Sequence, residues 1–174
     1  MLKSIQKKVK NLGSLLKFFS NKLSSSKLPF EIDDGEKIIR SIFSPINVDK
    51  KNKLRTNVFK SPSGMDEVSV NRLYYTTPDF CKQISKNIQS QQRTYFGLAL
   101  LTAKEIRNAK AKVIYSPIKN ENVFHADIKV GYVREKGVPA PSHINHITTK
   151  LKDQARFYID PNPNVENWTG PELL

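Results

Sequence analysis

The chain has 174 residues and a formal net charge of +13, because 29 Lys and Arg outnumber 16 Asp and Glu. This length suits one domain with a sizeable core, and no uninterrupted apolar run is long enough to predict a membrane-spanning helix. The single cysteine, Cys81, excludes an internal disulfide and a zinc cluster of several thiolates. Together with a poor secretory-signal pattern at the start, it predicts a cytoplasmic protein.

The positive charge favours a polyanionic partner such as nucleic acid. A competing interpretation is a lysine-rich proteome, since the chain has 22 Lys and only 7 Arg. Arg is the residue preferred for bidentate phosphate contacts, and it is not enriched here.

The first segment, residues 2–23, predicts a basic amphipathic helix. Its apolar side chains alternate at spacings of three and four, which places them on one stripe: Leu2, Ile5, Val9, Leu12, Leu16, Phe19 and Leu23. Packing against the protein's own core or a second copy is the usual use of such a stripe. A membrane surface and a partner or targeting helix are the alternatives, and the lack of Trp or Tyr argues against the membrane. A Ser-rich linker follows to residue 29.

The next segment predicts the start of the main domain, with a turn at Gly35 and a short helix over residues 36–42. A basic loop comes after it at 49–55. This loop is either a solvated surface segment or a phosphate-contacting one. On the second interpretation its binding residues are Lys50, Lys51, Lys53 and Arg55.

Residues 68–75 predict a strand, and Thr77-Pro78-Asp79 predicts a helix start, with a cap, a proline at the first position and an acid near the positive end of the dipole. Four apolar residues form the expected buried stripe of this helix: Phe80, Cys81, Ile84 and Ile88. Nothing nearby in sequence would activate Cys81, so we interpret it as a small core residue. The apolar run 94–101 predicts a central strand covered on both faces.

A capping box at Thr102 and Glu105 predicts a short helix, and residues 112–115 predict another strand. Ser142 is the expected cap of a last helix that runs to residue 157. The rest of the chain, from Asp160, predicts a loop in which Trp168 packs back onto the body.

The most regular pattern is the alternation over residues 123–133, which predicts a strand with one face on the core. His125 and Asp127 leave its polar face side by side, about 7 Å apart. A carboxylate beside an imidazole can form a general acid/base pair, so these two are the candidate catalytic residues. They can equally form a structural pair. Whether the last helix covers this face stays open.

Other chemistry finds less support. His125, Asp127, His143 and His146 carry metal-ligating groups, but their spacing matches no zinc signature, so we expect no metal. The chain has no phosphate-binding glycine loop or dinucleotide fingerprint, so we expect no cofactor. Arg72 and Arg93 lie near aromatic residues in the sequence, a combination that can hold phosphates and stack bases. The alternative is aromatics in the core with arginines reaching outward.

Together these patterns predict an α+β domain over residues 30–160, with a small mixed sheet covered by two or three helices. The basic helix and linker of residues 1–29 precede it, and a Pro/Asn-rich tail covers 161–174. The leading functional expectation is a small basic protein that binds or acts on nucleic acid, and His125 and Asp127 decide whether it is an enzyme. The alternative is a non-catalytic interaction protein that assembles through residues 2–23.

Overall fold

The computed structural model describes residues 28–174. The amphipathic helix predicted at 2–23 lies outside the described residues. The described chain forms an α+β fold built on one six-stranded sheet with the order β4-β5-β2-β1-β3-β6. The strands are β1 (Lys37–Ser44), β2 (Glu67–Arg72), β3 (Thr94–Thr102), β4 (Lys112–Tyr115), β5 (His125–Lys129) and β6 (Arg156–Ile159). Every neighbouring pair is antiparallel, so the prediction of a mixed sheet is wrong.

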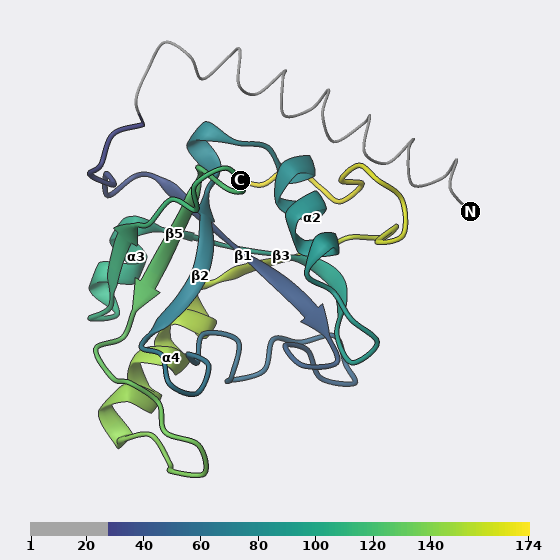
Figure 1. The fold of residues 1–174 in the computed structure, drawn as a ribbon. Helices are drawn as coiled ribbons and strands as arrows, with labels where there is room; N and C mark the ends of the chain where they lie inside the picture. Colours follow the sequence, from purple (N-terminus) through teal and green to yellow (C-terminus); the bar gives the residue numbers. More distant parts are fainter. Residues whose placement is uncertain (1–27) are drawn as a thin grey trace. The chain divides into compact units, whose positions relative to one another are not determined.

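Helices lie on both faces of this sheet. They are the 3-10 turn η1 (Leu73–Tyr75) and the α-helices α2 (Pro78–Asn87), α3 (Ala103–Asn108) and α4 (Ser142–Gln154). Helix α2 packs on one face, over β1 and β3, while α3 and α4 pack on the other (Figure 1). Across residues 28–174, no helix has the length and apolar character needed to cross a membrane.

The two faces of the sheet bury separate cores because side chains alternate along the strands. Ile38 and Ile42 of β1 enter the larger core, which α3 and α4 cover. Ile39 and Phe43 enter the smaller core under α2. The central strands β1 and β3 therefore bury both faces, as the apolar run of β3 predicts.

Several stretches differ from the expected secondary structure. The strand predicted at 68–75 ends at Arg72, where η1 begins, and the strand predicted at 123–133 covers only His125–Lys129. The helix predicted at 36–42 is strand β1, which pairs with β3 along its whole length. Its isoleucines at positions 38, 39 and 42 have the three- and four-residue spacings of a helix. The pairing of this segment between β2 and β3 makes it a strand instead. Helix α4 ends at Gln154, before the predicted 157, because Ala155 is already extended (φ −69°, ψ 125°). Residues 156–159 then form β6 on the outer edge of β3.

Glycine at position 97 makes the pairing of β6 with β3 possible. A Cβ built there would lie 2.3 Å from the backbone oxygen of Tyr158, which no side chain tolerates. Gly97 is therefore required for the close approach of the edge strand, a role that its position in an apolar run does not reveal.

The predicted helix caps are confirmed in two of three cases. Thr77 accepts a hydrogen bond from the Phe80 amide at 3.3 Å. The capping box is complete, with the Glu105 amide 3.2 Å from Thr102 Oγ1 and the Thr102 amide 2.6 Å from Glu105 Oε2. Ser142 is not a cap: the N-cap position belongs to Pro141, which provides no side-chain bond.

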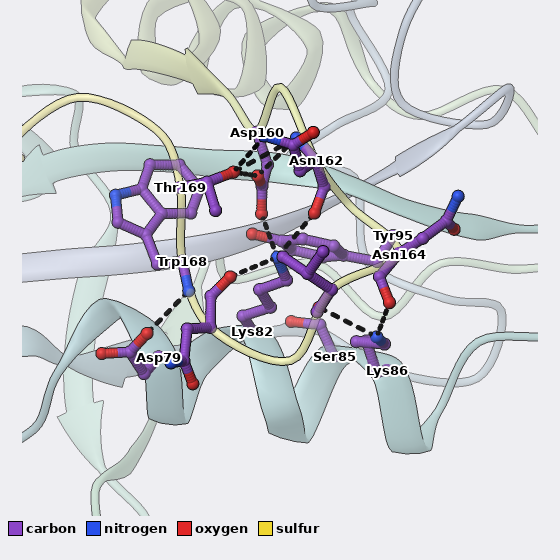
Figure 2. Close-up of polar contacts among 12 residues, drawn as sticks. Asp79, Lys82, Ser85, Lys86, Tyr95, Asp160, Asn162, Asn164, Trp168 and Thr169 are labelled. Carbon is purple, nitrogen blue, oxygen red and sulfur yellow. Dashed lines mark hydrogen bonds and ion pairs between the residues drawn. The ribbon is translucent and has the colours of Figure 1, made fainter.

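The C-terminal tail is held against α2 by a buried ion pair. Lys82 Nζ lies 2.7 Å from Asp160 Oδ2, and both side chains are fully buried. The same ammonium donates to the backbone oxygens of Asn162 and Asn167, at 2.9 and 2.6 Å, so the tail encloses it (Figure 2). Asp79 accepts from the Trp168 amide at 2.6 Å, and the indole joins the smaller core, which confirms that Trp168 packs on the body.

Candidate functional site

Strand β5 places His125 and Asp127 as the alternation predicts. Ala126 and Ile128 between and beyond them are fully buried in the larger core, on the face that α4 covers. His125 and Asp127 therefore leave the sheet on the opposite face. Since α4 carries His143 and His146 on the other side, the arrangement in which the last helix covers His125 is excluded.

The His125 ring is held by the segment that follows β4. His125 Nδ1 lies 2.7 Å from the backbone oxygen of Ser116, to which it donates its proton. The Ser116 hydroxyl donates to Asp127 Oδ2 at 2.5 Å. His125 Nε2 lies 3.8 Å from the other carboxylate oxygen, Asp127 Oδ1. The histidine and carboxylate are brought together as predicted, with Ser116 as an unpredicted third member.

This arrangement fixes which atoms can react. Because Nδ1 keeps its proton for the Ser116 carbonyl, the lone pair of neutral His125 is on Nε2. The Ser116 hydroxyl gives its proton to Asp127 instead of to the imidazole, so the group lacks the proton relay of a serine nucleophile. The side chains of His125 and Asp127 keep only 11% and 9% exposure. The group is an ordered, mostly buried hydrogen-bonded cluster with one imidazole nitrogen able to act as a base.

Arg40 is a charged neighbour that sequence reasoning missed. It lies on β1 beyond the two residue pairs that join β1 to β2, and its Nη1 donates to the Ser69 backbone oxygen at 2.6 Å. Burial, and after it the charge of Arg93, lower the pKa of Arg40 to about 10, while the charge of Asp127 opposes this shift. The available signal was one arginine inside an isoleucine-rich stretch that was predicted to be a helix.

Arg72 has a different place from the one predicted for a phosphate ligand. Its side chain is fully buried, with Nε 2.5 Å from Glu36 Oε1 and Nη2 2.7 Å from Glu36 Oε2. The guanidinium also lies 4.8 Å from the ring centre of Tyr75 and 5.0 Å from that of Tyr115. The charge of Arg72 therefore faces Glu36 and two aromatic rings inside the protein, and we do not count Arg72 among the residues that could contact a phosphate at the surface.

The basic loop at 49–55 is an ordered turn. Asp49 Oδ1 accepts from the backbone amides of Lys51 and Lys53 at 2.8 and 2.9 Å, and Val48 forms a bridge with Leu54. The hydrogen bond from the Lys53 amide, with smaller contributions from the Lys51 amide and nearby cations, holds the pKa of Asp49 below its usual range although burial opposes this. Three of the predicted binding residues are exposed to solvent on this turn, namely Lys50, Lys51 and Lys53. The fourth, Arg55, donates from its Nε to the Val48 backbone oxygen at 2.7 Å. Asp49, the one acid of the loop, is therefore used to hold the backbone of the turn.

The register of the sheet separates the predicted site residues into two groups. Ser44 at the end of β1 pairs with Thr94 at the start of β3, so the 49–55 loop and Arg93 lie at the same end of the sheet. His125 pairs with Asn71, and Asn71 pairs with Ile39. Ile39 lies five residues before Ser44 on β1. At 3.3 Å per residue this is about 16 Å along the strand. The His125 cluster and the basic loop are therefore not parts of one compact site.

Two hollows lie beside α4, outside both groups. A shallow one of about 710 Å³ is lined by His143, His146, Lys110 and Lys150. A narrower one of about 130 Å³ is lined by Lys60, Tyr132, Arg134 and the start of α4. Within the part of the chain that the structure describes, no group of three or more His, Cys, Asp or Glu is placed to hold a metal ion.

Comparison with known proteins identifies no family for this chain. The chain matches no protein-family model, no curated protein sequence and no solved structure.

Proposed function

We propose that this protein binds nucleic acid, without base specificity, through the basic surface at the end of β1 and the start of β3. The observation that carries the proposal is the Asp49 turn, which presents Lys50, Lys51 and Lys53 to solvent in a hydrogen-bonded frame. Lysines displayed in this way contact phosphates, which fix a protein on a strand but carry no sequence information. Arg93 lies at the same end of the sheet and is exposed.

The order of the loop favours binding over simple solubility. An already ordered loop loses less conformational freedom when it meets its partner than a flexible basic segment does. Residues 28–174 contain 22 Lys and Arg against 16 Asp and Glu, a net charge of +6. Residues 1–27 add seven lysines and no acid. A chain with this excess of positive charge attracts polyanions, and salt screening limits the distance over which the attraction acts.

The test compares two charge-matched triple variants of the full chain. Lys50→Gln/Lys51→Gln/Lys53→Gln removes three charges from the turn, and Lys104→Gln/Lys110→Gln/Lys112→Gln removes three exposed charges near α3. We expect the first variant to bind a labelled 20-nucleotide RNA of arbitrary sequence at least tenfold more weakly than the second in fluorescence anisotropy at low salt. Equal weakening would mean that net charge alone acts. Absence of binding by the wild type at 50 mM salt would end the proposal.

Acid–base chemistry at His125 is a second candidate, favoured by one observation. The bond from Nδ1 to the Ser116 carbonyl fixes the tautomer and leaves Nε2 as the base. The expected outcome is slow RNA cleavage in a buffer with a metal chelator, abolished by His125→Ala and unaffected by His143→Ala. Cleavage that persists in His125→Ala, or is absent from the wild type, would leave His125 with a structural role only.

A further inference from the structure

The 130 Å³ pocket lies at the same end of the sheet as the basic loop. Lys60 and Ser61 form one wall, Val130 to Arg134 form the second, and residues 138–140 with the first two turns of α4 form the third. Lys129 at the end of β5 pairs with Glu67 at the start of β2, and β2 runs antiparallel to β1. The start of β2, the end of β5 and the end of β1 therefore meet at one edge, where both the pocket and the 49–55 loop are found.

The lining of this pocket combines two cations and a few polar groups with apolar side chains, which are Val130, Val138, Pro139, Ala140 and Ile144. Lys60 and Arg134 supply two positive charges, Ser61 and Tyr132 supply hydroxyl groups, and no acidic residue is among the eleven that line it. Arg134 is held in place, because its amide donates to the Met65 oxygen at 3.1 Å and its Nη1 to the Ser61 oxygen at 3.3 Å. The two acids of the nearby strand end, Asp66 and Glu67, are paired with Lys129 at 3.4 and 3.2 Å.

The size of the pocket limits what can enter. A volume of about 130 Å³ is close to the roughly 150 Å³ of an engineered cavity that holds one benzene molecule. This suits a phosphate group but excludes a nucleoside with its base and sugar. An internal phosphate of a strand is attached on two sides and would have to thread through the pocket. A terminal phosphate is attached on one side and carries about −1.5 to −2 charge at neutral pH, which matches two cations.

We propose that this pocket binds the terminal phosphate of a nucleic-acid strand whose backbone continues over the Asp49–Arg55 turn. This inference rests on the proposed function, and it adds a preference for chain ends to an otherwise sequence-independent affinity. Lys60 and Arg134 bind the phosphate oxygens, with Arg134 held for contact by its bonds to Met65 and Ser61. The positive end of α4 beside the pocket adds to the attraction.

The experiment uses three oligonucleotides of one sequence and length, bearing a 5′-phosphate, a 3′-phosphate or no terminal phosphate, each with an internal label. We expect the wild type to bind one phosphorylated form at least tenfold more tightly than the unphosphorylated form. Arg134→Gln removes this preference, and so does Ala140→Leu, which fills the pocket without changing charge. Lys53→Gln weakens binding of all three forms by a similar factor and so retains the preference.

The outcomes separate the two proposals. Equal affinity of the wild type for all three oligonucleotides, with salt-dependent binding retained, overturns the terminal-phosphate site and leaves the proposed function. A preference that survives in both Arg134→Gln and Ala140→Leu also overturns this site. Failure of all three forms to bind overturns both proposals. Inorganic phosphate at millimolar concentration is the final check, since it should reduce the preference for the phosphorylated form more than it reduces binding of the unphosphorylated form.

Discussion

The two faces of the sheet are stabilised in different ways. The face under α3 and α4 is an apolar core in which residues such as Leu101, Ile106 and Ile128 are almost fully buried. The face under α2 combines a smaller apolar cluster with the fully buried Lys82–Asp160 ion pair and a tail wrapped around it. Apolar burial is non-directional and tolerant, whereas a buried ion pair stabilises only when every partner is in place. The α2 face should therefore be the more sensitive to removal of a single group.

The largest expected effect is the loss of one partner of the buried pair. Asp160→Ala leaves the Lys82 ammonium buried without its counter-ion, and we expect a loss of about 3–5 kcal/mol in the free energy of unfolding. Asp153→Ala is the matched control, because Asp153 pairs with Lys152 at the surface with 58% of its side chain exposed, and such pairs contribute at most about 1 kcal/mol. Urea denaturation measures both. A similar small loss for the two variants would show that the tail is not held by this pair.

Truncation of one leucine on each face compares the two cores directly. Leu101→Ala in the larger core should cost about 3 kcal/mol, because β1, α3 and the other strands surround the cavity it leaves. Leu173→Ala, in the tail on the α2 face, should cost about 1–2 kcal/mol, since the last residues of the chain can adjust. Thermal denaturation followed by circular dichroism measures both changes. Equal losses would mean that the tail is as rigid as the sheet.

Acid should weaken the α2 face through Asp160. Burial by itself raises the pKa of Asp160, but the ion pair with Lys82 and the hydrogen bond from Thr169 lower it overall. A lowered pKa contributes stability that is present above the ordinary Asp value of about 3.9 and is lost as the pH falls through the folded value. The difference in the free energy of unfolding between the wild type and the less stable Asp160→Asn variant should therefore shrink below about pH 4. A difference that stays constant down to pH 2 would contradict this assignment.

The smallest effect is expected at His125. His125→Ala removes a ring whose partners are the Ser116 oxygen and the Asp127 carboxylate, on the face opposite the larger core. We expect a loss of about 1 kcal/mol, because the truncation opens no cavity in the larger core. Ser116→Ala, which removes a 2.5 Å hydrogen bond to Asp127, should cost about as much. A loss of several kcal/mol in His125→Ala would make this cluster a main source of stability.

The contrast between the faces also explains what the sequence could predict. Apolar periodicity located β3, β4, β5 and α2, and the polar face of His125 and Asp127 followed from the alternation of β5 alone. The interior of the α2 face was hidden, because a sequence pattern assigns charged residues to solvent and Lys82 is fully buried. The same reasoning misplaced Arg72, whose partner Glu36 is 36 residues away in sequence.

Contacts between residues far apart in the sequence explain the remaining differences between the sequence predictions and the structure. The isoleucines of β1 have helical spacing, and only the place of this segment between β2 and β3 makes it a strand. Ser116 was not a candidate because its contact with Asp127 depends on the pairing of β4 with β5. The basic loop was located correctly, whereas its hydrogen-bonded frame from Asp49 could be read only from the structure.

The most direct test of the proposed function is the salt dependence of RNA binding by the wild type and the Lys50→Gln/Lys51→Gln/Lys53→Gln variant. If these lysines contact phosphates, their loss removes about three released counter-ions. The slope of the logarithm of the binding constant against the logarithm of salt concentration should then become shallower by about 2 for a single strand. Measurements between 50 and 200 mM salt give both slopes. Parallel lines for the two proteins would contradict the account, because they would show that the lysines of the Asp49 turn do not contact the nucleic acid.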